Sequence, residues 1–145
     1  MPAHQKLFID DVFGKPAKGR KKKGATPRGP SKLEIAFKAA WSLADDRSEF
    51  TLSSEVVFHP ERRWRLDFAI LDLLLGIEIQ GGTFMRGGHS RGIGQNRDYE
   101  KHNAATALGW RVLFADTKML APSKIMQTVA SFIEIARQIR LEKSA

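Results

Sequence analysis

The sequence predicts an α/β protein with a mixed β-sheet that has helices on both faces. Two apolar, strand-like runs, residues 64–70 and 73–82, follow one another with only a short turn around Asp72 between them, which favours an antiparallel pair. A further strand at residues 110–115 follows a helical segment, and a strand–helix–strand unit implies a crossover and therefore a parallel pair.

Charge divides the 145-residue chain into two parts. Residues 15–32 contain eight Lys or Arg and no acid, whereas residues 33–145 contain 15 basic and 14 acidic side chains, so most of the net charge of +8 lies near the N-terminus. A segment of Lys, Arg, Gly, Pro and Ala cannot bury enough apolar surface to offset its ordering entropy. We therefore predict a flexible basic N-terminal arm over residues 1–30 and a single domain over residues 31–145. The arm is a solubilising linker, a localisation signal or an arm that binds nucleic-acid phosphates.

The domain opens with a predicted helix from Ser31 to about Ala44. Ser31 followed by Glu34 three residues later is a capping-box pattern, and apolar residues recur at helical spacing behind it at Leu33, Phe37, Ala40, Trp41 and Ala44. The cap explains Glu34 completely, but a carboxylate near the start of this helix is also a candidate for an active site. Both interpretations stay open.

The central pair of strands carries two carboxylates where core strands normally carry hydrophobic residues. After a strand at residues 55–58 and a turn at 59–62, side-chain alternation predicts Leu66, Phe68 and Ile70 on one face. Asp67 then shares the other face with Arg65 and Ala69. In the next strand Glu78 and Gln80 point away from Ile77 and Ile79, so pairing of the two strands brings Asp67 and Glu78 together.

A glycine-rich stretch and two helices complete the chain. Residues 81–94 hold six of the twelve glycines together with Arg86, His89 and Arg91, as either a flexible connection or a loop that approaches a phosphate chain. A helix over residues 96–108 ends at Gly109. The last helix, from Pro122 to about Leu141, has an apolar face that forms core or a dimer seam.

Asp67 and Glu78 on one apolar face require a compensating partner, because burying a lone carboxylate is costly. Arg65 or a nearby Lys would supply it as a structural ion pair. A divalent cation is the other solution, since magnesium binds a few carboxylates, a backbone carbonyl and waters, and leaves room for a phosphate oxygen. Together with the basic arm and the Gly/Arg loop, the second solution favours phosphodiester hydrolysis.

Several other classes of protein are disfavoured by composition. The absence of cysteine excludes disulfide frameworks and thiolate zinc sites, and it is compatible with a reducing compartment. The longest apolar stretch, around residues 68–79, is interrupted by Asp72 and Glu78, and the N-terminus lacks the pattern of a signal peptide. We therefore expect a cytoplasmic protein without a membrane partner.

The pattern Asp67, ten residues, Glu78-Ile79-Gln80 resembles the D…E-x-K core of the PD-(D/E)XK nuclease superfamily. The surrounding blocks resemble small phage-borne endonucleases of that superfamily, and the similarity covers roughly residues 31–120, through residues 58–69, 78–83, 88–89, 98–101 and 103–113. The resemblance implies a restriction-endonuclease-like mixed β-sheet flanked by helices, in a phage or bacterial protein of the host-cell cytoplasm.

The resemblance also assigns roles to individual residues. It implies that Asp67, Glu78 and the backbone carbonyl of Ile79 bind Mg²⁺, for which Mn²⁺ substitutes, and that Glu34 matches an additional acidic ligand of many members. Gln80 departs from the pattern because lysine is usual there, and an amide supplies neither a positive charge nor a base. Lys101 is our candidate to supply the charge, with an intrahelical ion pair to Asp98 as the alternative.

The implied activity is that of a metal-dependent endodeoxyribonuclease, most simply one that cuts branched DNA such as a Holliday junction as a homodimer. The residues expected to contact DNA are basic side chains of the arm and loop: Lys15, Lys18, Arg20, Lys21, Lys22, Lys23, Arg86, His89 and Arg91. Alternatives are a nicking, mismatch-processing or other phage DNA-processing nuclease, and a non-catalytic DNA-binding module, which Gln80 makes plausible. An HNH-nuclease interpretation of His89, Asn96 and His102 fails on spacing.

Overall fold

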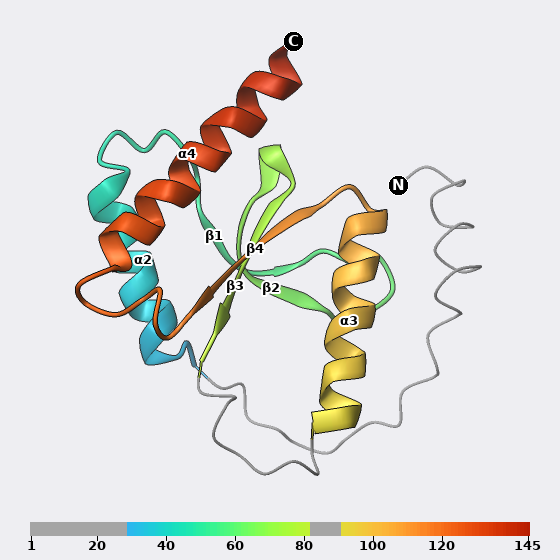
Figure 1. Ribbon diagram of the computed structural model, residues 1–145. Helices are drawn as coiled ribbons and strands as arrows, with labels where there is room; N and C mark the ends of the chain where they lie inside the picture. The colour runs from blue at the N-terminus through green and yellow to red at the C-terminus, as the bar shows by residue number, and fades with distance from the viewer. Residues whose placement is uncertain (1–28, 82–90) are drawn as a thin grey trace.

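The computed structural model describes residues 29–81 and 91–145 and confirms the predicted order of elements (Figure 1). The elements in chain order are α2 (Lys32–Ala44), β1 (Ser53–Val57), β2 (Arg65–Ile70), the 3₁₀ turn η1 (Leu71–Leu73), β3 (Leu75–Gln80), α3 (Arg91–Ala107), β4 (Arg111–Asp116) and α4 (Ile125–Ser144). All of the predicted arm except its last two residues lies outside the described residues.

The four strands form one mixed sheet in the order β1-β2-β3-β4. β1 pairs with β2 and β2 with β3 in antiparallel fashion, whereas β3 and β4 are parallel. The turn η1 joins β2 to β3 within a few residues, and Leu74 takes the left-handed conformation at its end with φ of 51°. The connection from β3 to β4 passes through α3, as a parallel pair requires. The predicted mixed sheet is confirmed.

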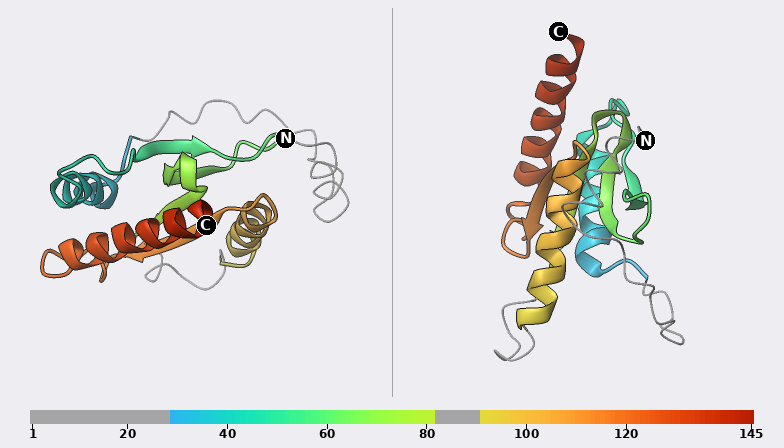
Figure 2. Two further views of the ribbon diagram at one scale, coloured as in Figure 1. Left: turned by 90° about the horizontal axis from the view of Figure 1, so that it is seen from above. Right: turned by 90° about the vertical axis from the view of Figure 1, so that its right-hand side faces the viewer.

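Helices cover both faces of the sheet, as predicted. α2 and α4 lie on one side of the strands and α3 on the other, and the view from above in Figure 2 agrees with Figure 1. The larger core fills the space between the sheet and the α2/α4 layer, with Phe37, Phe68, Ile77 and Phe132 among its members. A smaller core under α3 consists of Leu66, Ala69, Ala105 and Trp110.

The apolar face of α4 belongs to the core. Val129, Phe132, Ile133, Ala136 and Ile139 are at most 5% exposed and pack in the larger core. Burial of this stripe within the chain explains its helical spacing without a second subunit.

Some predicted boundaries were wrong by a few residues. α3 begins at Arg91 rather than Asn96, because the two glycines at positions 92 and 94 weaken a helix without preventing it. β1 begins at Ser53 rather than Glu55, since Ser53 and Ser54 pair with β2. α4 begins at Ile125 rather than Pro122, because residues 121–124 form a tight turn in which the Lys124 N–H donates to the Ala121 carbonyl at 2.8 Å.

The predicted faces of β2 were also wrong at one position, which matters for the site. Phe68 and Ile70 face the α2/α4 layer as expected, but Leu66 packs under α3 with Ala69. The alternation therefore changes phase at Asp67. Its neighbour across the ladder is Glu55, which has a left-handed backbone with φ of 55° in the middle of β1. Such a local disruption of pairing twists a strand and redirects its side chains.

Candidate functional site

Asp67 and Glu78 meet where β2 begins and β3 ends. The register pairs Phe68 with Ile77, so the next position along the two strands places Asp67 opposite Glu78. The Ile79 N–H donates to Asp67 Oδ2 at 2.7 Å, so the side chain of Asp67 contacts the β3 backbone beyond the last ladder pair. The two carboxylates therefore lie close together, as expected. They are carried by β2 and β3, the two central strands of the sheet.

Asp67 carries a strongly perturbed carboxyl group. The pKa of Asp67 is raised to about 7, chiefly by burial; the charge and hydrogen bonding of Glu78 and the charge of Glu34 also raise it, and the hydrogen bond from the Ile79 N–H lowers it. Desolvation and neighbouring carboxylates both disfavour the ionised form, and a bound cation would relieve both effects. A titratable group shifted in this way is a marker of functional sites.

The capping role predicted for Glu34 is confirmed, and its carboxylate also lies near Asp67. Its carboxylate Oε2 accepts a hydrogen bond from the Ser31 N–H at 2.7 Å, and the Glu34 N–H donates to Ser31 Oγ at 3.2 Å, which completes the predicted capping box. The same side chain lies close enough to Asp67 for its charge to raise the pKa of that carboxyl. The cap therefore places a third carboxylate at the site.

Glu78 and Lys101 form an ion pair across the β3–α3 interface. Glu78 is 8% exposed, and Lys101 Nζ contacts its Oε1. Among the described side chains, the ion pairs of Lys101 do not include Asp98, so the intrahelical alternative is not the one adopted. The structural ion pair with a nearby lysine, which was the alternative to a cation, is therefore present at Glu78.

Gln80 and the carbonyl of Ile79 occupy the end of β3. Gln80 is exposed and, by alternation from Glu78, belongs to the α3 face of the sheet. Ile79 is partly buried and packs against the larger core. The Ile79 N–H contacts Asp67, and Gln80 follows Ile79 as the last residue of β3.

His102 is a site residue that sequence reasoning missed. Its Nε2 lies 3.8 Å from Glu78 Oε1, and its ring packs edge-on against Phe114 with the centroids 4.8 Å apart. Burial, together with the charge of Lys101, lowers the pKa of His102 in spite of Asp98. The sequence signal for it is weak: His102 precedes the apolar Ala105 by three positions, so the two lie near the same helix face.

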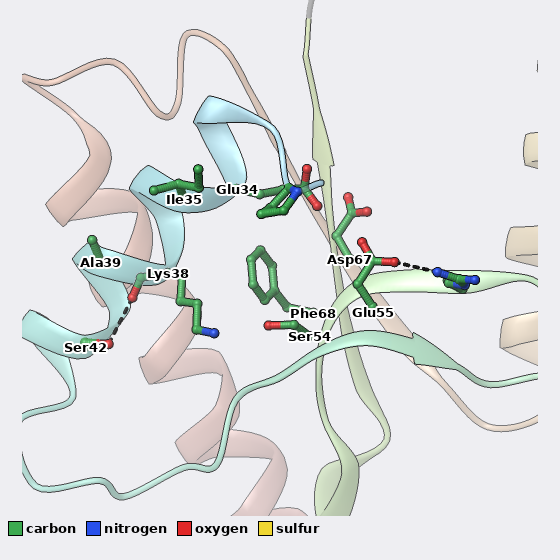
Figure 3. Close-up of a pocket in the computed structure, with 11 residues that line it drawn as sticks. Glu34, Ile35, Lys38, Ala39, Ser42, Ser54, Glu55, Asp67 and Phe68 are labelled. Carbon is green, nitrogen blue, oxygen red and sulfur yellow. Dashed lines mark hydrogen bonds and ion pairs between the residues drawn. The ribbon is translucent and has the colours of Figure 1, made fainter. Parts of the chain in front are cut away.

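A groove runs from the carboxylates along α2. Its volume is about 670 Å³, and it lies between one face of α2 and strands β1 and β2. Figure 3 shows the labelled carboxylates of Glu34, Asp67 and Glu55 gathered at one end, with Lys38 on the α2 side. The remaining lining is largely apolar or small: Pro30, Ile35, Ala39, Ser42, Ser54 and Phe68, with Arg65.

The ion pair of Arg65 is with Glu55, at 2.9 Å. The structural partner suggested for Asp67 is therefore engaged elsewhere.

The carboxylates at this site suit a cation such as magnesium, which does not require a complete set of protein ligands. Within residues 29–81 and the described side chains that follow, no three His, Cys, Asp or Glu gather as a metal-binding group. Magnesium does not need such a group, since it is commonly held by one or two carboxylates while substrate phosphates and waters complete the octahedron. Asp67 and Glu78 meet that requirement, with Glu34 beside Asp67.

The residues expected to contact DNA cannot be placed at the site. Lys15, Lys18, Arg20, Lys21, Lys22 and Lys23 of the arm, and Arg86 and His89 of the loop, lie outside the described residues. Arg91 is the first residue of α3, so its backbone is helical.

Comparison with models of protein families, with curated proteins and with solved structures finds no match to this chain. Of the helices in the described part of the chain, none combines the length and apolar character needed to cross a membrane.

Proposed function

We propose that this chain is a divalent-metal-dependent nuclease that hydrolyses phosphodiester bonds in DNA. Within that class, the proposal is a structure-specific endonuclease for branched DNA, a Holliday junction resolvase that acts as a homodimer. The observation that carries the proposal is the convergence of Asp67 and Glu78 on adjacent strands, with Asp67 held at a raised pKa and Lys101 beside Glu78.

Each residue has a role that its position supports. Asp67 and Glu78 would hold Mg²⁺ or Mn²⁺, with the Ile79 carbonyl and Glu34 as further ligands. A bound cation of this kind lowers the pKa of a coordinated water and stabilises charge on a phosphate. Lys101 would supply the positive charge that Gln80 cannot, and Gln80 would orient a water or contact the phosphate through its amide.

The groove beside Asp67 is the proposed path of the DNA strand. It begins at the carboxylates and passes Lys38, so a phosphate at the cation would continue into a channel with a basic side chain on its wall. The basic arm would add affinity that depends on salt rather than on sequence, because Lys and Arg release counterions from phosphates. Resemblance to the PD-(D/E)XK superfamily supports the same assignment.

The choice of a branched substrate rests on the resemblance, the small size of the domain and the position of Glu34. Resolving a junction requires two symmetric cuts, and a two-fold dimer supplies two equivalent sites. A protein that remains monomeric both in solution and on junction DNA would contradict the resolvase version but not the nuclease itself.

One gel panel tests the chemistry and the substrate together. Wild type, Asp67→Asn and Glu78→Gln would be incubated with Holliday junctions, flaps, mismatched duplex and linear duplex in magnesium, manganese or EDTA. We expect cleavage of the junction by wild type only, in either metal, with binding retained by both variants. Undiminished cleavage by the variants would refute the assignment, and preferential cleavage of mismatched or linear duplex would favour a nicking or mismatch-processing nuclease.

A non-catalytic DNA-binding module is the second candidate. It is favoured by the ion pair between Lys101 and Glu78, because a lysine already balances this buried carboxylate without a cation. Tight junction binding with no cleavage in either metal, and no effect of magnesium on thermal unfolding, would support this candidate.

A further inference from the structure

The imidazole of His102 has a buried nitrogen without a hydrogen-bond partner in the described part of the chain. That atom is Nε2, and it lies 3.8 Å from Glu78 Oε1. Buried polar atoms in folded proteins nearly always have a partner, and those that lack one call for an explanation. A movement of the His102 ring toward Glu78 by about 1 Å would bring Nε2 and Oε1 to normal hydrogen-bond distance.

The surrounding packing directs this nitrogen toward Glu78. The His102 ring stands edge-on to Phe114 at an interplanar angle of 89°, and Phe114 is the ladder partner of Glu78 across β3 and β4. Lys101, the preceding residue on α3, contacts the same oxygen, Oε1. Two consecutive residues of α3 therefore converge on one carboxylate oxygen and leave Oε2 for another ligand.

We propose that His102 is a positioning residue for Glu78. In this role the His102 Nε2–H donates to the Glu78 carboxylate and holds it in the direction of Asp67. The proposal rests on the nuclease function above and concerns how that site is held. Outer-shell hydrogen-bond partners generally hold metal ligands in place. A hydrogen bond from His102 would in the same way keep the Glu78 carboxylate oriented while Lys101 and a cation compete for it.

Two substitutions separate this role from simple packing against Phe114. His102→Phe keeps an aromatic ring on Phe114 but loses the nitrogen, whereas His102→Gln loses the ring but keeps an N–H donor of similar reach. If His102 positions Glu78, His102→Phe raises the Mg²⁺ concentration for half-maximal cleavage by about tenfold, and His102→Gln restores most of the wild-type value. A packing role predicts the reverse order.

The control is Asn103→Ala, the next residue along α3, where the side chain is exposed. We expect this variant to show wild-type magnesium dependence. Thermal unfolding of each variant identifies any that fails to fold. Wild-type magnesium dependence in a folded His102→Phe would overturn the proposal.

A measurement without cleavage distinguishes this proposal from the nuclease function. The ¹⁵N resonance of His102 Nε2 would be recorded in wild type and in Glu78→Gln, without metal. We expect a protonated Nε2 in the wild type, with a resonance that moves when Glu78 is changed. If the wild type cuts no DNA but this resonance responds, the contact stands and the nuclease proposal fails. An unprotonated or unresponsive Nε2 in a protein that cleaves DNA overturns the positioning role alone.

Discussion

Replacing Asp67 by Asn should stabilise the protein at alkaline pH while removing the proposed activity. The pKa of Asp67 rises from its ordinary value of 3.8 to about 7 on folding, chiefly through burial, with Glu78 and Glu34 adding to it. A raised carboxyl pKa means that the folded state binds more protons than the unfolded state between these values. Stability is therefore lost as pH rises through this window, and the full penalty is present above pH 7.

The size of the penalty follows from that interval. For a fully shielded carboxyl it would be about 4 kcal/mol, at 1.36 kcal/mol per pH unit. Asp67 is only partly buried, so we halve this figure for solvent screening and expect about 2 kcal/mol. Asn keeps an oxygen that can accept from the Ile79 N–H but carries no charge, so Asp67→Asn should be more stable than wild type by about 2 kcal/mol at pH 8 and by less than about 1 kcal/mol at pH 5.

Urea unfolding followed by tryptophan fluorescence, in EDTA at pH 5 and pH 8, measures this difference. Asp72→Asn in the exposed turn η1 is the control, and we expect its stability relative to wild type to change little between the two pH values. A variant at position 67 that is less stable than wild type at pH 8, or whose advantage does not depend on pH, would refute the electrostatic reasoning.

Three other predictions test the neighbouring parts of the site. Lys101→Met should destabilise the protein by about 3 kcal/mol because it leaves Glu78 buried and unpaired, and adding Glu78→Gln should recover part of the loss in a double-mutant cycle measured by urea unfolding. Ala39→Trp should obstruct the groove and weaken DNA binding in a fluorescence-anisotropy titration, whereas Ala130→Trp, at an exposed position on α4, should not; equal binding by both would remove the groove from the DNA path. Replacing the three lysines at 21–23 by Ala should reduce the slope of log K against log salt by up to about 3, at about 0.9 per lost phosphate contact, and an unchanged slope would show that these lysines do not contact DNA.

Much of the site was predictable because it depends on local patterns. A turn too short for a crossover makes the two strands antiparallel neighbours and so places Asp67 close to Glu78, although the side-chain alternation predicted for β2 was wrong at Leu66. The capping box predicted how Glu34 is held, and Lys101 was the candidate for a positive charge near the carboxylates. The turn and the cap depend only on residues that are neighbours in the chain.

The sequence by itself therefore determined the order of elements, the mixed sheet and the residues of the carboxylate pair. Only the tertiary structure decided the direction of Asp67, because this depends on the left-handed Glu55 in the neighbouring strand and on where the β2–β3 ladder ends. Only the tertiary structure revealed His102, because a nitrogen that lacks a partner is defined by the groups packed around it. Local periodicity places a side chain on a face, whereas contacts between distant segments determine what that side chain meets there.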